Sequence, residues 1–146
     1  MNNDVHSYEV NLKWDYDTKG TLTSPVLPTA IEVATPPDFP RGMVGIWSPE
    51  HLFVASVNAC LMATFLAIAD NSKMKFSDFK SNALGKVEKI EGKYSVTEIR
   101  IEPKLEVASL ENEEKIRRIF EMSEKACAIS NSITSKIILS PVITVS

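Results

Sequence analysis

The longest run without a charged side chain covers residues 52–69 and is apolar at most positions. Ser48 is a typical helix N-cap residue, Pro49 suits the first helical position, and Glu50 places negative charge near the positive end of the helix dipole. The pattern therefore predicts a helix over residues 48–70. Because this helix is apolar on nearly all sides, we expect it to be buried on all sides. A chain of this length covers such a helix with difficulty, which favours a dimer.

Alternating apolar and polar residues precede the helix. Residues 5–16 alternate with period two and predict a strand with one apolar face. Residues 17–20 predict a turn, and residues 21–24 and 30–34 predict two more strands, so the N-terminal third is expected to form a small antiparallel sheet. Residues 35–47 contain Pro and Gly together with large apolar side chains, which predicts a loop packed against the rest of the protein.

After the helix, the spacing of the apolar residues changes again. Residues 74–90 and 94–107 predict two strands of a long hairpin. Residues 109–125 have the spacing of an amphipathic helix, with a serine as its expected cap. Residues 136–145 predict a last strand, which Pro141 places at an edge or interrupts with a bulge. Strand runs separated by two helices predict an α+β fold with antiparallel or mixed sheets.

Composition and charge narrow the class of protein. The length suits a single domain over residues 1–146. Nineteen acidic and 16 basic residues give a net charge of −3, which gives no argument for a nucleic-acid or anionic-membrane partner. Residues 1–4 lack the basic and apolar regions of a signal peptide. Two cysteines are too few for a disulfide scaffold, so we expect a reducing, cytoplasmic setting.

The apolar run at residues 52–69 also raises the question of a membrane span, because its length reaches the lower limit for one. It is rich in Ala, it contains Ser, Asn and Thr, and its flanks lack an aromatic and basic belt. These features favour a core helix and predict that the protein does not span a membrane. A membrane-anchored protein is retained as an alternative that partition experiments distinguish.

Metal and hydrolytic chemistry have little support in the sequence. His6, His51, Cys60 and Cys127 are too widely spaced to form the paired motifs of a metal site, so no metal is expected. The chain contains no serine-nucleophile motif, phosphate loop or dinucleotide fingerprint, so no cofactor is expected. The two cysteines are the remaining candidates for chemistry.

Each cysteine has a structural and a chemical interpretation. Cys60, in the middle of the apolar helix, is either an inert core residue or a nucleophile that needs a cation from another segment. Cys127 lies where one helix ends, so backbone N–H groups there are expected to lower its pKa. Glu50 precedes Cys60 by ten residues, roughly 15 Å along the axis. If Glu50 and Cys60 serve one site, a bridging residue or a second subunit must connect them; otherwise Glu50 only complements the helix dipole.

Two segments resemble the signatures of a known family. Residues 48–55 (SPEHLFVA) and 58–60 (NAC) resemble the P-E-x-L-x-x-A…A-C helix of the OsmC/Ohr family of thiol peroxidases. Residues 126–132 (ACAISNS) resemble that family's second signature, a Cys followed by x-x-S-N. The resemblance covers nearly the whole chain and implies an intertwined homodimer. In such dimers, sheets from both chains enclose two long central helices, and the active sites lie at the interface.

The resemblance also implies a mechanism. Cys60 would attack a hydroperoxide and become a sulfenic acid, Cys127 would condense with it to a disulfide, and a dithiol donor would reduce that disulfide. Glu50 corresponds to the family glutamate that holds a catalytic arginine. The N-terminal sheet region that supplies this arginine in the family has only lysines here. Arg41, in the loop before the helix, is the best substitute by proximity, and a lysine would be a poorer one. Ala128 stands where a proline is common.

A second function remains open. The same dimer would enclose a dry interfacial pocket, and an apolar small molecule bound there would leave the cysteines as core residues. Large apolar side chains of the loop and the helix motivate this alternative: Phe39, Trp47, Met62 and Phe65.

Overall fold

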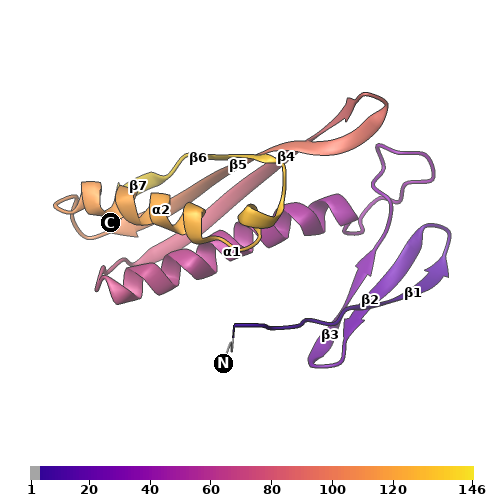
Figure 1. Ribbon diagram of the computed structural model, residues 1–146, viewed down its shortest axis with the longest axis horizontal. Coiled ribbons are helices and arrows are strands. Elements are labelled where there is room, and N and C mark those ends of the chain that lie inside the picture. Colours follow the sequence, from indigo (N-terminus) through magenta and orange to yellow (C-terminus); the bar gives the residue numbers. More distant parts are fainter. Residues whose placement is uncertain (1–3) are drawn as a thin grey trace. The chain divides into compact units, whose positions relative to one another are not determined.

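A computed structural model describes residues 4–146 (Figure 1). Within them, the contacts separate the chain into two compact units, one ending at Leu52 and the other running from Phe53 to Ser146. A single domain over residues 1–146 stays a prediction. Residues 1–3, which contribute to the expectation of no signal peptide, lie outside the described residues.

The first unit contains the predicted antiparallel sheet. It is formed by β1 (Asn11–Tyr16), β2 (Lys19–Ser24) and β3 (Leu27–Val33), in the order β1-β2-β3. The turn between β1 and β2 uses Asp17 with a positive φ of 47°. The first strand begins six residues later than predicted, because β2 offers partners only from Asn11 onward. The apolar face expected on β1 is not covered within this unit, and Trp14 is 71% exposed.

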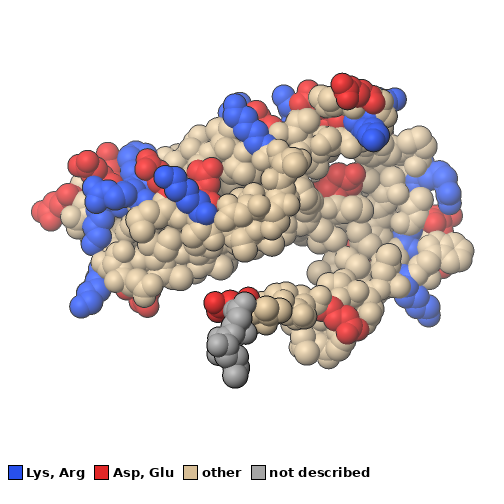
Figure 2. All heavy atoms as spheres, in the orientation of Figure 1, with Lys and Arg blue, Asp and Glu red and all other residues tan. Residues whose placement is uncertain are grey.

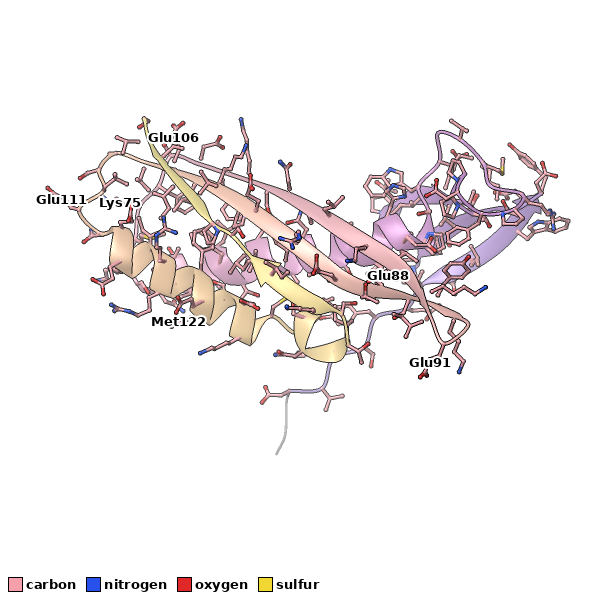
Figure 3. All side chains as sticks on the ribbon, turned by 90° about the horizontal axis from the view of Figure 1, so that it is seen from above. Lys75, Glu88, Glu91, Glu106, Glu111 and Met122 are labelled. Atoms are coloured by element: carbon pink, nitrogen blue, oxygen red, sulfur yellow. The ribbon has the colours of Figure 1, made fainter. Side chains whose placement is uncertain are left out.

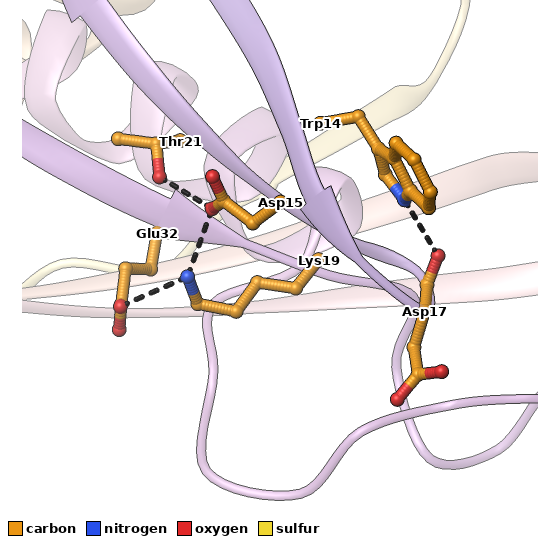
Figure 4. Close-up of polar contacts among 6 residues, drawn as sticks. All are labelled: Trp14, Asp15, Asp17, Lys19, Thr21 and Glu32. Carbon is orange, nitrogen blue, oxygen red and sulfur yellow. Dashed lines mark hydrogen bonds and ion pairs between the residues drawn. The ribbon is translucent and has the colours of Figure 1, made fainter.

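A buried lysine joins the three strands. Lys19 Nζ lies 2.9 Å from Asp15 Oδ2 and 3.1 Å from Glu32 Oε1 (Figure 4). Thr21 Oγ1 donates a hydrogen bond of 2.6 Å to the same Asp15 oxygen. The hydrogen bonds to Asp15 and then to Glu32 raise the pKa of Lys19. The ammonium group of Lys19 therefore forms ion pairs with two carboxylates of its own sheet.

The proline-rich loop folds back on its own start. The N–H of Ala34 donates to the carbonyl of Trp47 at 2.8 Å, which closes the two ends of the loop. A Cβ added at Gly42 would overlap the backbone of Pro36 and Pro37. This close approach requires a glycine. The predicted packing of the loop's large apolar side chains is not met for Val44 and Trp47, which are 85% and 55% exposed.

The central helix α1 (Pro49–Asn71) begins where the sequence predicts. The backbone N–H of His51 donates to Ser48 Oγ at 3.1 Å, which confirms Ser48 as the cap. The N–H of Ser48 donates in return to His51 Nδ1 at 3.3 Å. His51 thus takes the place that Glu or Gln holds in the usual reciprocal cap.

The second unit is a mixed sheet covered by helices. The predicted hairpin is formed by β4 (Asp78–Ile90) and β5 (Lys93–Val107), which pair in antiparallel register. The last predicted strand is divided into β6 (Lys136–Leu139) and β7 (Val142–Val145), on either side of Pro141. Both segments pair in parallel with β5, so β5 is the central strand.

The amphipathic helix α2 (Glu113–Ala126) begins four residues later than predicted. Ser109 Oγ accepts the N–H of Glu111 at 3.2 Å and so stabilises a turn before the helix. The buried face of α2 meets α1 through aromatic stacking, since the rings of Phe65 and Phe120 are 4.3 Å apart. Met122 lies on the outer side of α2 (Figure 3) and is 47% exposed.

The helix α1 is covered on one side only. Its buried residues recur every four positions and face the sheet: Val57, Leu61, Phe65 and Ala69. Met62 and Leu66, on the other side, are 41% and 38% exposed. The surface over α1 in Figure 2 consists mostly of uncharged residues. The prediction that α1 is buried on all sides is therefore not met within the second unit.

Length and hydropathy alone leave two interpretations of this helix. It has 23 residues and a mean hydropathy of 2.1 over its most apolar window, and among the described residues only this helix is long and apolar enough to cross a membrane. A core helix of a soluble protein meets the same criteria.

Candidate active site

Both cysteines belong to the second unit, and the fold brings them together. Cys60 lies in the middle of α1, and Cys127 is the C-cap residue of α2. Both are free thiols, Cys60 half-buried and Cys127 fully buried. The two thiol groups are hydrogen-bonding partners. The sequence separation of 67 residues is therefore bridged by the packing of α1 against the segment that follows α2.

A tight turn after α2 supplies the polar groups of this site. Cys127 has φ −70° and ψ 112°, which ends the helix, and the short 3-10 helix η1 (Ser130–Ser132) follows. The N–H of Asn131 bonds to the carbonyl of Cys127 at 3.0 Å. The N–H groups of Ala128 and Ile129 are not used in this turn, as expected at the start of a helical segment. They donate to the sulfur of Cys60 instead.

These donors control the ionisation of Cys60. Burial by itself raises the pKa of this thiol. Hydrogen bonds from the Cys127 thiol, the N–H of Ile129, the Thr64 hydroxyl and the N–H of Ala128 outweigh burial and hold the pKa below its ordinary value. Hydrogen-bond donors of the second unit therefore favour the Cys60 thiolate. From the sequence, we expected a cation to have this role.

Cys127 has the opposite shift. Burial raises its pKa, and the hydrogen bond with Cys60 raises it further, while the hydroxyl and N–H of Ser130 only partly oppose this. The sequence analysis expected the backbone N–H groups near Cys127 to favour its own thiolate. Two of them, from Ala128 and Ile129, act on Cys60 instead. The pair is therefore polarised, with Cys60 the more easily ionised thiol.

Two contributing residues were missed by the sequence analysis. Thr64 Oγ1 lies 4.0 Å from Cys60 Sγ, one helical turn further along α1. The spacing of four residues was the available signal, since such positions are neighbours on a helix. Ser130 belongs to the second signature, but its contact with Cys127 depends on the conformation of the turn.

Glu50 and Arg41 belong to the first unit. One carboxylate oxygen of Glu50, Oε1, is buried and has no hydrogen-bond partner among residues 4–146. Arg41 is exposed and has a positive φ of 65°, and its carbonyl accepts a hydrogen bond of 3.0 Å from Thr18. Over the same residues, Arg41 and Glu50 form no ion pair with each other. Their participation in the site of Cys60 and Cys127 stays a prediction.

The described residues offer a depression for a ligand and no arrangement for a metal ion. No group of three or more His, Cys, Asp or Glu side chains among residues 4–146 is arranged to hold a metal ion. An open depression of about 360 Å³ lies beside the segment that follows η1. Its lining combines apolar and hydroxyl side chains: Phe53, Ser95, Val96, Ser132, Ile133, Thr134 and Ser135.

Comparisons with known proteins agree with this fold. An OsmC-like protein of unknown function from Vibrio cholerae has a TM-score of 0.85 at 21% identity, covering 94% of this chain and 100% of that one. An organic hydroperoxide resistance protein from Elizabethkingia anophelis has a TM-score of 0.78 at 17% identity, covering 99% of both chains. The organic hydroperoxide resistance protein of Bacillus subtilis has a TM-score of 0.67 at 16% identity, covering 94% of this chain and 98% of its own.

At these identities the solved structures establish the α+β, OsmC-like fold. No curated protein sequence matches the chain. The model of the OsmC-like protein family, in contrast, matches residues 42–141. That match spans more than half of the chain and includes both cysteine signatures, and the chain belongs to the OsmC-like protein family.

Proposed function

We propose that this protein is a cysteine-based thiol peroxidase that reduces hydroperoxides, with Cys60 as the nucleophile and Cys127 as its resolving partner. The observation that carries the proposal is the polarised thiol pair. The thiol with the lowered pKa is the half-buried one, and a hydrogen bond from the second thiol helps to lower it. A thiolate that a peroxide can reach and a second thiol in contact with it are what this chemistry requires.

The reaction balances with the groups of this pair. The Cys60 thiolate attacks one oxygen of the hydroperoxide, the O–O bond breaks, and the leaving alkoxide takes up a proton to become an alcohol. Cys60 is then a sulfenic acid. The sulfur of Cys127 attacks it, the S–O bond breaks, and water leaves as the disulfide forms. A dithiol reductant returns both cysteines to thiols.

The surroundings of Cys60 favour an organic hydroperoxide. Val57 and Leu61, next to it on α1, are fully buried in the same cluster that Ile129 packs against. Ile129 also presents its N–H to the sulfur. The exposed side chains beside Cys60 on α1 are apolar as well: Ala59, Met62 and Ala63. An alkyl group of the substrate would replace water over these exposed side chains, which hydrogen peroxide would not do.

The same proposal includes a homodimer. The uncovered side of α1 is apolar, and a helix that is apolar all round needs cover on that side as well. The buried, unpartnered Oε1 of Glu50 requires a hydrogen-bond donor. A second copy would cover α1 and supply that donor, for which Arg41 is the candidate because its guanidinium has no ion pair within residues 4–146. We place this dimer in the cytoplasm.

Free-thiol titration tests the proposal. The reduced protein is mixed with cumene hydroperoxide, and the remaining thiols are counted over time, with Cys60→Ser as the control. We expect both thiols to disappear in the unaltered protein and the single thiol of the control to persist. Cys127→Ser should react once and stop at a sulfenic acid that dimedone labels. Unchanged thiols in the unaltered protein would reject the peroxidase.

The depression beside η1 supports a second function. Phe53, Val96 and Ile133 give it an apolar wall, and hydroxyl groups line the remainder. An apolar small molecule with a polar group suits such a surface. Native mass spectrometry of freshly purified protein tests this alternative: a retained molecule would support it, and a clean apo protein would count against it.

A further inference from the structure

We propose that the thiol that reduces the Cys60–Cys127 disulfide attacks the sulfur of Cys60, so that Cys127 is the leaving group. This inference rests on the proposed function, because it takes the disulfide as its starting point. It identifies the sulfur to which the dithiol reductant of that function becomes linked.

Access to the two sulfurs decides the direction of attack. Cys127 is 0% exposed within the described chain, and it lies at the end of α2 with Cys60 and Ser130 as its hydrogen-bonding partners. A second copy or a bound partner removes exposure and never adds it, so Cys127 stays inaccessible in any assembly of this fold. Cys60 is partly exposed in one chain, and the proposed function requires it to stay open to a hydroperoxide when a second copy covers the exposed side of α1. An external thiolate therefore meets Cys60 first.

The leaving-group preference opposes this direction. A thiol with a lower pKa leaves faster, and Cys60 has the lower pKa of the two. On that ground alone the reductant would attack Cys127 and expel Cys60. Attack on Cys127 would require local opening of the turn that follows α2, however, and the free-energy cost of that opening adds to the barrier. Attack on Cys60 has the disadvantage that Cys127, the thiol with the higher pKa, must leave. Ser130 reduces this disadvantage, because its N–H and hydroxyl stabilise the departing Cys127 thiolate.

The chemistry then selects a dithiol. The reductant thiolate bonds to Cys60, the Cys60–Cys127 bond breaks, and Cys127 leaves as a thiolate that takes up a proton. A second thiol on the reductant attacks its own sulfur in the mixed disulfide and releases Cys60, so the reductant becomes a cyclic disulfide. A monothiol lacks this step. Cys127 remains in place beside Cys60 and returns the monothiol by reforming the disulfide.

Adduct mapping tests the inference without any hydroperoxide. The reduced protein is oxidised with diamide, which takes both electrons of the thiol pair, and is then treated briefly with excess 2-mercaptoethanol. Acid quenching, N-ethylmaleimide and peptide mass spectrometry follow. We expect the mercaptoethanol adduct on Cys60 and the maleimide on Cys127, in an excess of about tenfold or more, since even a modest opening cost has this effect.

Two single-cysteine variants provide the matched control. The thiol of Cys60 in Cys127→Ser should react with a disulfide reagent at least about tenfold faster than the thiol of Cys127 in Cys60→Ser. The buried thiol of Cys127 reacts only after the turn that follows α2 has opened. Adducts mainly on Cys127, or equal amounts on both cysteines, would overturn the inference and leave the peroxidase intact. Failure of diamide to link the two cysteines would reject the resolving role of Cys127 and this inference together.

Discussion

Replacing Gly85 with alanine tests the close packing of α1 on β4, which fixes the helix that carries Cys60. A Cβ added at Gly85 overlaps Cγ2 of Val54, whereas Val54 Cβ at 3.8 Å and Val96 Cγ1 at 3.9 Å are ordinary contacts. Val54 is β-branched and turns away with difficulty. We therefore expect Gly85→Ala to push the helix from the sheet and to reduce the free energy of unfolding by about 1–3 kcal/mol.

A double-mutant cycle separates this overlap from other effects of the new methyl group. Val54→Ala alone should cost about 1 kcal/mol, because it removes two partly buried methyl groups. In that background the overlapping atom is gone, and Gly85→Ala should cost nothing or stabilise slightly, since alanine limits the unfolded chain more than glycine does. The expected interaction energy between the two positions is about 1–3 kcal/mol in favour of the double variant.

Urea unfolding followed by circular dichroism measures the four free energies. The protein concentration must be equal in all samples, because dimerisation would make the apparent stability depend on it. Additive costs of the two substitutions would refute the packing argument. A stable Gly85→Ala variant in the presence of Val54 would refute it as well.

Three further predictions concern the thiol pair and the uncovered face of α1. Ser130→Ala should slow disulfide formation and disulfide reduction, measured by stopped-flow fluorescence, because Cys127 loses a donor that favours its thiolate. Cys127→Ala should move the pH profile of Cys60 alkylation: without the thiol hydrogen bond the pKa of Cys60 rises, and the rate near neutral pH falls. Met62→Glu should convert the dimer to a monomer in size-exclusion chromatography, whereas Met122→Glu, an equally exposed methionine on α2, should not.

Local signals predicted the elements of this fold well. Ser48 and Pro49 mark the start of α1 because capping depends on residues within one turn. Glu91 and Gly92 mark the hairpin between β4 and β5, and both have the positive φ that a tight turn requires. Pro141 correctly indicated an interruption in the last strand, since it cannot donate to a ladder.

The site was predicted only in part, because its properties depend on tertiary packing. The identity of the two cysteines was readable from motifs, but the order of their pKa values was not. That order follows first from the hydrogen bond between the two thiols, which lowers the pKa of Cys60 and raises that of Cys127, and then from the N–H groups of Ile129 and Ala128. No spacing in the sequence specifies these contacts. The exposure of one side of α1 could not be predicted from the sequence either. The apolar pattern predicts that the helix is buried, but it does not indicate whether the same chain or a second copy buries it.

The central claim is that one hydroperoxide converts Cys60 and Cys127 of the same chain into a disulfide. The most direct measurement is mass spectrometry of unreduced peptides after an equimolar addition of cumene hydroperoxide to the reduced protein. We expect both thiols to be lost together and the peptides containing Cys60 and Cys127 to be linked. Two free thiols after the reaction, or Cys60 oxidised to a sulfinic acid beside a free Cys127, would contradict it.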